Sequence, residues 1–402
     1  MRVAMLHNFY CQRGGEDAVF AAEAALLERF GHSVHRFSVQ NRDLAGSSLG
    51  SLVACAAKSV YNPASGRELR RFLRQAGADL VHIHNFFPQL SPSAHWAARA
   101  EGLPVVQTLH NYRLLCAGAT LYRDGRICEK CLGRSFPLAG VRHGCFRGSR
   151  TGSAAVAGMV GLHRVLRTWS DKVDVYIAPT EFARRKFIEG GLPAERIAVK
   201  PHFVAADPGP GEGRGGYVFF AGRLAEGKGI STMLAAWAKL RGLFRLKIAG
   251  DGPQASRARQ AAASVPGVDW LGEKRHAEIL ELMGDAALLL VPSEWYETFG
   301  LVAIEAYAKG TPVLASDLGA VAELVRPRRT GWLFRPGDAE DLAQTVLRAL
   351  SSAEDLREMR RQARREFEER FQPEQNYRQL MRIYETARAR AEGLALRRAG
   401  VQ

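Results

Sequence analysis

Two glutamates and two basic residues in the second half of the chain have types and spacing that suit a chemical role. Glu297 lies in a polar loop, and Glu305 follows eight residues later among apolar neighbours. A carboxylate can accept two charge-assisted hydrogen bonds, which suits the paired hydroxyls of a sugar or a ribose. Arg223 and Lys228 share one glycine-containing loop and could clamp a diphosphate. Together the four residues predict a site for a sugar joined to a diphosphate.

Each pair also has an ordinary alternative. The glutamates could be solvent-facing acids of an amphipathic helix, and the two cations could belong to a solvated loop. Glu305 fits the first alternative poorly, because residues 301–304 and Ala306 beside it are all apolar. The loop of Arg223 and Lys228 is expected opposite that of Glu297, which makes a merely solvated loop the weaker interpretation. We therefore favour the binding site.

The elements that must position Glu297 and Glu305 are parallel strands and the helix between them. Apolar residues 286–291 and 312–315 predict two buried strands, and residues 300–309 predict a helix. In open α/β sheets ligands bind beyond the carboxyl ends of strands, where helix N-termini offer unpaired amides to anions. We expect the loop of Glu294 and Glu297 to face a cleft, with the amides near Gly300 available to a phosphate.

The same alternation of strand, loop and helix occurs in both halves of the chain, which predicts an α/β fold of two doubly wound domains. At 402 residues the chain suits two domains of about 200 residues each. Residues 201–216, with Pro208, Pro210 and several glycines, predict the linker. We place the N-terminal domain at 1–200 and the C-terminal domain at 217–385. The strands expected in them are 3–9, 33–39, 79–83, 105–109, 173–178, 217–221, 244–249 and 268–272.

Polar residues follow the expected strands of the N-terminal half. His84-Asn85 and His110-Asn111 each come directly after a strand, so they are expected at the same edge of the sheet. A lone histidine is more often structural, but this placement favours a role for His110. Gly14-Gly15 follows the first strand and could let backbone amides approach a phosphate or sugar, although a plain tight turn is the alternative.

Four cysteines fall within thirty residues of the N-terminal half, in a loop region at 112–150. Cys116, Cys128, Cys131 and Cys145 have the spacing C-x11-C-x2-C-x13-C. A C-x2-C turn can present two thiolates to one tetrahedral metal, so the set predicts a structural zinc site. Four reduced cysteines brought together by chance are the alternative, and disulfides are not expected in a reducing compartment.

Composition is that of a soluble globular protein, with 47% apolar and 24% charged residues. No apolar run reaches membrane-spanning length and the first strand starts at once, so we expect a cytoplasmic protein. The net charge of +15 is uneven, because residues 1–200 carry 27 Lys and Arg against 15 Asp and Glu. This asymmetry predicts an anionic partner, although a general preference for arginine is the alternative. The expected contacts with an anionic membrane surface are Arg142, Arg147, Arg150 and the run Arg184-Arg185-Lys186.

The second half resembles a known family, the retaining GT-B glycosyltransferases of the large family 4. The resemblance runs through residues 217–340 and is looser in the first half, where Gly14-Gly15, the strand end at His84 and Thr108-x-His110 carry it. The matching residues of the second half are Gly222-Arg223, Lys228-Gly229, Gly250-Asp251-Gly252-Pro253, Pro292-Ser293, Glu297-x-Phe299-Gly300-Leu301 through Glu305, Gly310-x-Pro312-Val313, Glu323 and Thr330-Gly331.

This resemblance implies two Rossmann-like domains facing an interdomain cleft, with the acceptor on the first domain and a nucleotide-sugar donor on the second. It implies that Arg223 and Lys228 neutralise the diphosphate, that Glu297 holds the sugar and Glu305 the ribose, and that His110 lies by the reacting groups. Gly14, Gly15, Gly250, Gly252, Phe299, Gly300 and Leu301 are the further donor-binding residues it implies. The four cysteines are not part of the family pattern.

The expected activity is therefore a retaining, metal-independent transfer of a sugar from a nucleotide-diphosphate sugar. The expected acceptor is a polysaccharide, a lipopolysaccharide or a lipid-linked saccharide, which would place the enzyme peripherally on the inner face of the membrane. No catalytic cofactor is expected. Two alternatives stay open: a nucleotide-sugar 2-epimerase on the same fold, and a basic zinc-containing protein that binds nucleic acid. The second has weak support, because aromatic residues do not interleave the basic stretches.

Overall fold

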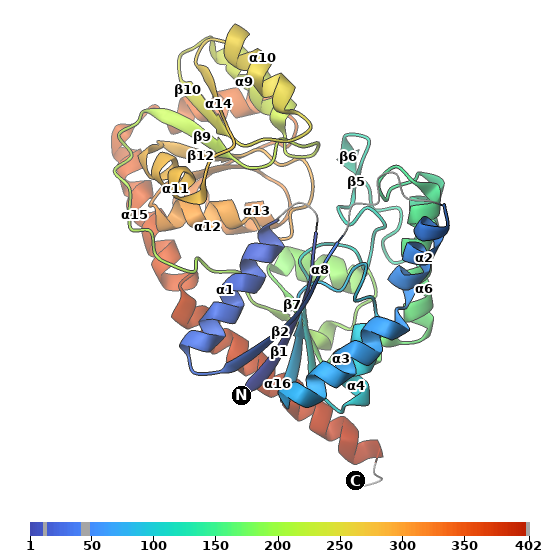
Figure 1. The fold of residues 1–402 in the computed structure, drawn as a ribbon. Helices are drawn as coiled ribbons and strands as arrows, with labels where there is room; N and C mark the ends of the chain where they lie inside the picture. Colours follow the sequence, from blue (N-terminus) through green and yellow to red (C-terminus); the bar gives the residue numbers. More distant parts are fainter. Residues whose placement is uncertain (11–13, 42–48, 399–402) are drawn as a thin grey trace. The chain divides into compact units, whose positions relative to one another are not determined.

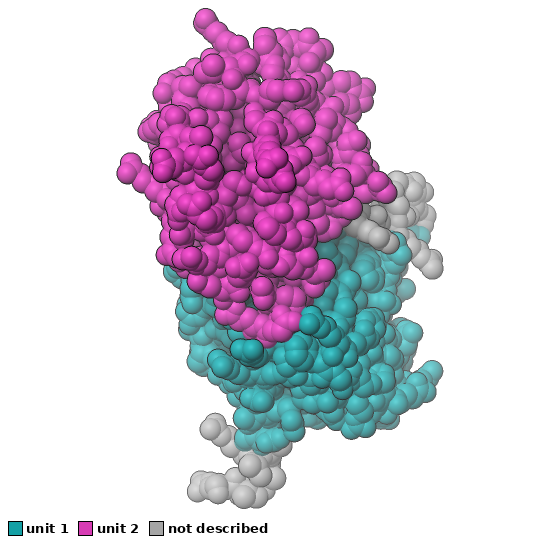
Figure 2. Space-filling view, turned by 90° about the vertical axis from the view of Figure 1, so that its left-hand side faces the viewer, with its two compact units in different colours: residues 1–121, 128–201, 377–402 teal, residues 122–127, 202–376 magenta. Residues whose placement is uncertain are grey.

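A computed structural model describes residues 1–10, 14–41 and 49–398. The chain divides into two compact units, shown in teal and magenta in Figure 2. The first unit holds Met1–Leu121, Cys128–Pro201 and Tyr377–Gln402, and the second holds Tyr122–Ile127 and His202–Asn376. Each unit contains one six-stranded parallel sheet with helices around it, which confirms the predicted α/β fold class.

The first sheet has the strand order β2-β1-β3-β4-β7-β8. Its central strands are buried on both faces, as expected for short apolar strands that helices cover on each side. The strands are β1 (Arg2–Phe9), β2 (Ser33–Gln40), β3 (Leu80–Ile83), β4 (Val105–Thr108), β7 (Val175–Ala178) and β8 (Ile197–Val199). The helices are α1 (Gly15–Arg29), α2 (Leu49–Val60), α3 (Pro63–Ala76), α4 (Ser93–Ala100), α5 (Leu138–Arg142), α6 (Arg150–Val165), α7 (Thr168–Asp171), α8 (Glu181–Glu189) and the short η1 (Ala194–Arg196).

The second sheet has the order β11-β10-β9-β12-β13-β14. Successive residues of β9 alternate between two apolar cores, with Phe219 in one and Val218 in the other. The strands are β9 (Tyr217–Ala221), β10 (Arg245–Ala249), β11 (Val268–Gly272), β12 (Leu288–Val291), β13 (Val313–Ser316) and β14 (Gly331–Phe334). The helices are α9 (Ile230–Leu240), α10 (Ala255–Ser264), α11 (His276–Asp285), α12 (Leu301–Ala308), α13 (Gly319–Leu324), α14 (Ala339–Ala349) and α15 (Ala353–Arg370).

The last helix, α16 (Pro373–Arg398), carries the chain back to the first unit. Leu380, Ile383 and Tyr384 of α16 pack into the apolar core that Val3 and Met5 of β1 help to form. Tyr384 is fully buried there. The final segment thus completes the core of the sheet with which the chain began (Figure 1).

The cysteine-containing region holds a small antiparallel hairpin of its own, β5 (Tyr122–Arg123) and β6 (Arg126–Ile127). Sequence periodicity does not predict it, because its strands have two residues each. The apolar stretch 153–169 forms α6 and, after Arg167 at a φ of 53°, the separate short helix α7. Helix α1 begins at Gly15, and the Asp17 side chain accepts a hydrogen bond from the Gly14 amide at its N-terminus over 2.9 Å.

Candidate active site

In the second unit, Lys228 and Glu297 form an ion pair at the carboxyl ends of β9 and β12. Lys228 Nζ donates to Glu297 Oε1 over 2.6 Å, and Ser293 Oγ donates to the same oxygen over 2.9 Å. Burial raises the pKa of Glu297, but the positive charge and hydrogen bond of Lys228 outweigh it and leave the pKa below its ordinary value. Glu297 is therefore ionised at neutral pH and able to accept hydrogen bonds from sugar hydroxyls.

The loop that carries Lys228 is fixed against the loop of Glu297. The amide of Glu294 donates to the Gly227 carbonyl over 2.7 Å, and Thr232 Oγ1 donates to Glu294 Oε1 over 2.5 Å. A side chain at Gly229, where φ is 69°, would place its Cβ 1.8 Å from the carbonyl oxygen of Pro292. Only glycine permits this approach, and it brings the cation within reach of the carboxylate. The two loops expected to lie opposite each other are thus in contact.

Arg223 is exposed and, among the described residues, has no ion-pair partner. Its neighbours in the chain are held by backbone bonds, since the Leu224 amide donates to the Asp251 carbonyl over 2.8 Å. An exposed guanidinium on a fixed loop is available to an anion.

Glu305, on α12, accepts a hydrogen bond from His276 at the start of α11. His276 Nε2 lies 3.0 Å from Glu305 Oε1, and this hydrogen bond raises the pKa of His276. The two side chains are 65% and 22% exposed, so Glu305 is not a core residue despite its apolar neighbours. Sequence reasoning missed His276, because 29 positions separate it from its partner.

The predicted donor-binding glycines are explained in part by packing. At Gly250 and Gly252 a Cβ would lie 1.9 Å from the Gly222 carbonyl oxygen and 2.6 Å from that of Leu224. Gly300 is the N-cap of α12 at a φ of 117°, with no side chain capping that helix. Phe299 is buried against His202 and Phe371, so its ring belongs to the core, while Leu301 begins α12 and is partly buried.

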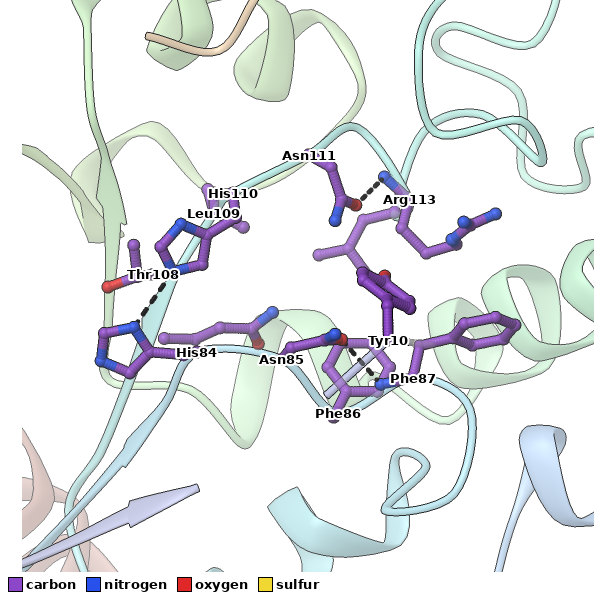
Figure 3. Close-up of a pocket in the computed structure, with 12 residues that line it drawn as sticks. Tyr10, His84, Asn85, Phe86, Phe87, Thr108, Leu109, His110, Asn111 and Arg113 are labelled. Atoms are coloured by element: carbon purple, nitrogen blue, oxygen red, sulfur yellow. Dashed lines mark hydrogen bonds between the residues drawn. The ribbon is translucent and has the colours of Figure 1, made fainter. Parts of the chain in front are cut away.

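In the first unit a small pocket opens at the carboxyl ends of β1, β3 and β4 (Figure 3). His110 lines it and lies 3.0 Å from His84, Nε2 to Nδ1. Burial, together with the nearby charges of His82 and His110, pushes the pKa of His84 well below its ordinary value. Neutral His84 therefore orients the ring of His110 at the edge of the pocket. Tyr10, Asn85, Phe87, Asn111 and Arg113 also line it.

Glu16, on α1, is the acidic residue beside this pocket that sequence reasoning missed. Asn85 Nδ2 donates to its Oε1 over 3.1 Å, and Asn111 Nδ2 donates to its Oε2 over 3.2 Å. Burial and the neighbouring Asp17 raise the pKa of Glu16 to about 8. Its position two residues after Gly14 could have indicated it, but the asparagines that hold it are 69 and 95 positions away.

The two predicted glycines of the first unit differ from those of the second. Gly14 has extended backbone, its amide donates to Asp17 Oδ2 over 2.9 Å, and a Cβ there would meet none of the described residues within 4 Å. Gly15 is the first residue of α1. Contact of this glycine pair with a ligand remains a prediction.

Beneath His84 lies a fully buried ion pair. Lys200 Nζ donates to Glu23 Oε1 over 2.6 Å, and both side chains are 0% exposed. The ligand atoms of Glu23, His82 and His84 all lie within 4.8 Å of one another, a spacing that a metal could use. However, His82 already shares hydrogen bonds of 2.8 Å with both Tyr384 and Thr108, and Lys200 supplies the positive charge. The group is therefore a structural support for the pocket.

The structure brings the four predicted zinc ligands into one region. Burial, together with the nearby Cys116, Cys145 and Cys128, raises the pKa of the Cys131 thiol to about 11. Within the described residues no cysteine is in a disulfide. The four cysteines are not a set of ligand atoms within 4.8 Å of one another, so a metal would require the loop to contract.

Comparison with known proteins agrees with this division into two units. Residues 210–366 match the family model of the group 1 glycosyl transferases. Residues 14–202 match the model of the glycosyl transferase 4-like domain. Both models describe glycosyl transferases, which supports the predicted family, and the retaining mechanism stays a prediction.

Individual relatives resemble the whole chain. A phosphatidyl-myo-inositol mannosyltransferase of Mycobacterium leprae is 29% identical over 82% of this chain and 79% of its own length. The sucrose-phosphate synthase of Thermosynechococcus elongatus has a TM-score of 0.70 at 18% identity, over 96% of this chain and 99% of its own. Anabaena HepE in complex with UDP has a TM-score of 0.67 at 20% identity, over 96% and 100%. These structures share the GT-B fold.

Along the described residues no helix is both long and apolar enough to cross a membrane, and the cytoplasmic location remains a prediction.

Proposed function

Since residues 210–366 match the group 1 glycosyl transferases and residues 14–202 match the glycosyl transferase 4-like domains, we propose that the protein is a retaining glycosyltransferase. It moves a sugar from a nucleotide-diphosphate sugar to a saccharide or lipid-linked acceptor and keeps the anomeric configuration of that sugar. The observation that carries the proposal is the contact of Lys228 with Glu297, beside the exposed Arg223, in the unit that matches the group 1 model. This contact places a cation that can bind phosphate beside a carboxylate that can bind sugar hydroxyls.

On the donor side, Arg223 and Lys228 bind the diphosphate and Glu297 binds the hydroxyls of the sugar. Glu305, oriented by His276, accepts hydrogen bonds from the ribose. Anabaena HepE, solved with UDP, supports a nucleoside diphosphate as the ligand of this fold. The cations act when the bond between the anomeric carbon and the phosphate oxygen breaks, because the leaving diphosphate then gains negative charge.

On the acceptor side, His110 and Glu16 bind the acceptor hydroxyl, with Asn111 and Arg113 beside them. Retention of configuration requires the acceptor oxygen to attack the anomeric carbon on the same face of the sugar from which the diphosphate departs. The acceptor oxygen then forms a bond to the anomeric carbon, the bond from carbon to phosphate oxygen breaks, and the acceptor proton moves to the leaving phosphate oxygen. Arg223 and Lys228 supply the stabilising charge for this step, so we expect turnover to need no added divalent cation.

For the four cysteines we propose one structural zinc. Cys131 lies near the other three thiols, and a metal would bind them as thiolates and hold a region with little core of its own. Metal analysis of untagged protein should give about one zinc for each chain. Below about a tenth of an equivalent, the cysteines would be ordinary reduced thiols.

The test of the function is a screen of UDP-, GDP- and ADP-sugars for donor hydrolysis and for protection against thermal unfolding. We expect one nucleotide class to protect the protein and to be hydrolysed slowly without an acceptor. NMR of the product made with an added saccharide acceptor then gives the anomeric configuration. Interconversion of the donor sugar with no transfer would identify an epimerase instead, and no protection by any of these sugars would reject the donor site.

A further inference from the structure

The exposed apolar side chains of the described residues are concentrated on one part of the first unit. Of the nine large apolar residues that are exposed, seven form what we call the α2–α6 face: Val53, Tyr61, Phe136, Leu138, Leu162, Val165 and Leu166. Leu138 and Val165 are 67% and 68% exposed. Apolar residues scattered singly need no explanation, but such a concentration indicates an interaction surface.

These residues lie on elements that pack together. Both α2 and α5 pack against α6, and Figure 1 shows α2 beside α6. The ring of Phe136 lies on Gly161 of α6, so closely that a Cβ there would be 2.1 Å from it. Leu162, Val165 and Leu166 follow at spacings of three and four, which puts them on one side of the end of α6. The face is therefore continuous from α5 to α6.

The segment from Lys130 to Ser170, which contains α5 and α6, is positively charged. From Lys130 to Ser170 the chain has seven Lys and Arg and no Asp or Glu. Arg134, Arg142, Arg147 and Arg150 are exposed, and within the described ranges none of them has a carboxylate within 4.0 Å. The charge of these four arginines, which lie on the same stretch of chain as α5 and the start of α6, is therefore not neutralised by the protein.

The run Arg184-Arg185-Lys186, which sequence reasoning grouped with these arginines, is different. Lys186 lies 2.8 Å from both Glu129 and Glu189. Arg184 donates to the Ile197 carbonyl over 3.1 Å and lies 3.7 Å from Glu181. Acidic partners take up much of the charge of that run, so we leave it out of the surface.

We propose that the α2–α6 face docks on an anionic lipid membrane. Each exposed basic residue near anionic headgroups strengthens binding, and the apolar side chains between them can enter the boundary of the acyl chains. A second copy of the chain fits less well, because a two-fold interface would place the same positive charges opposite one another. A nucleic acid would match the arginines but gives no reason for exposed leucine and valine. Docking would give the enzyme access to a lipid-linked acceptor, and this part of the inference rests on the proposed function.

The experiment is sedimentation of the full chain with vesicles of phosphatidylcholine and rising fractions of phosphatidylglycerol. We expect binding that rises with the anionic fraction and falls with salt. The double variant Arg142→Gln/Arg150→Gln should weaken it about 30-fold, since each charge contributes about 1 kcal/mol. Its matched control, Arg357→Gln/Arg365→Gln on the exposed side of α15, removes the same charge and should bind like the parent.

A second pair of variants tests the apolar part. Leu138→Asn/Val165→Asn should weaken binding about tenfold at every salt concentration, because lost apolar burial is not screened. Leu243→Asn, at a leucine that is 63% exposed in the second unit, is the control and should have no effect. All variants should keep the nucleotide-sugar protection of the parent, which separates a failure of docking from a failure of the proposed function.

Three outcomes would overturn the inference. One is no binding to anionic vesicles at low salt, and another is binding that neither double variant weakens. The third is a dimer, seen by analytical ultracentrifugation, that Leu138→Asn/Val165→Asn converts to a monomer while vesicles do not bind. In that case the face is a contact between two copies of the chain.

Discussion

The charged residues near the two candidate sites differ in their burial. In the first unit Glu23 and Lys200 are paired in a dry interior below the pocket, and the histidines above them are kept neutral. In the second unit Arg223 is exposed, and Lys228, Glu297 and Glu305 are each partly exposed to solvent. Buried charge positions other groups, whereas charge at a loop end can stabilise a changing ligand. Substitutions should therefore cost stability in the first unit and activity in the second.

The largest effect is expected from the buried pair. Lys200→Met should destabilise the protein by about 3–5 kcal/mol, because the carboxylate of Glu23 would stay buried without its cation. Denaturant unfolding measures the loss. The double variant Glu23→Gln/Lys200→Met should recover much of it, since no unpaired charge remains. A single variant as stable as the parent would contradict the contrast between the two units.

The donor cations should behave in the reverse manner. Arg223→Ala and Lys228→Ala should each lower turnover by about 10²–10³, or about 2.7–4 kcal/mol in the transition state. Arg223→Ala should leave the free energy of unfolding unchanged, because its side chain is exposed. Arg357→Ala, at an exposed arginine of α15, is the control. Normal turnover in both loop variants would remove the diphosphate role.

Acid should affect the first unit through its buried histidines. Burial lowers the pKa of His82 and of His95 to about 4. Below about pH 6.5 these histidines are protonated in the unfolded chain but stay neutral in the folded chain. The free energy of unfolding should therefore fall as the pH goes from about 6.5 to 4. Each histidine can account for up to about 3 kcal/mol. His95→Gln should reduce the slope of unfolding free energy against pH in that range.

His276 should show the opposite sign. Its pKa is raised by Glu305, so its contribution is complete below about pH 6.5 and is lost as the pH rises through the folded-state value. A rise in stability from pH 6 to 9 that disappears in His276→Gln would mean that this assignment is wrong. NMR titration of the two groups of histidines separates them directly.

The smallest effect is expected at the ribose. Glu305→Gln should weaken binding of the nucleoside diphosphate about tenfold, since a charge-assisted hydrogen bond becomes a neutral one. His276→Gln should have a weaker effect in the same direction, because it only orients the carboxylate. Glu297→Gln should spare the nucleoside diphosphate and impair the sugar donor. Calorimetry with the diphosphate and with the intact donor distinguishes these outcomes, and unchanged affinity in Glu305→Gln would exclude the ribose role.

Sequence reasoning succeeded where the relevant residues are close in the chain. The apolar runs that became β9, β12 and β13 predicted the parallel sheet. Lys228 and Glu297, expected on loops opposite each other, lie in contact, and their role at a donor stays a prediction. Glu16 and His276 were missed because hydrogen bonds to residues 29 to 95 positions away define their surroundings. The bond between His82 and Tyr384, 302 positions apart, is beyond any local pattern.

That last contact has a consequence for how the protein is made. The core of the first sheet includes Leu380, Ile383 and Tyr384, which the ribosome adds only after the whole second unit. At a synthesis rate of roughly 5–20 residues per second, the apolar surface of the first sheet is exposed for roughly ten to forty seconds before the helix that covers it is made. During this interval the nascent chain presents a ready binding surface for chaperones. A gene shortened before Tyr377 would leave that surface exposed permanently, so such a truncation should yield aggregated protein even though the second sheet is intact.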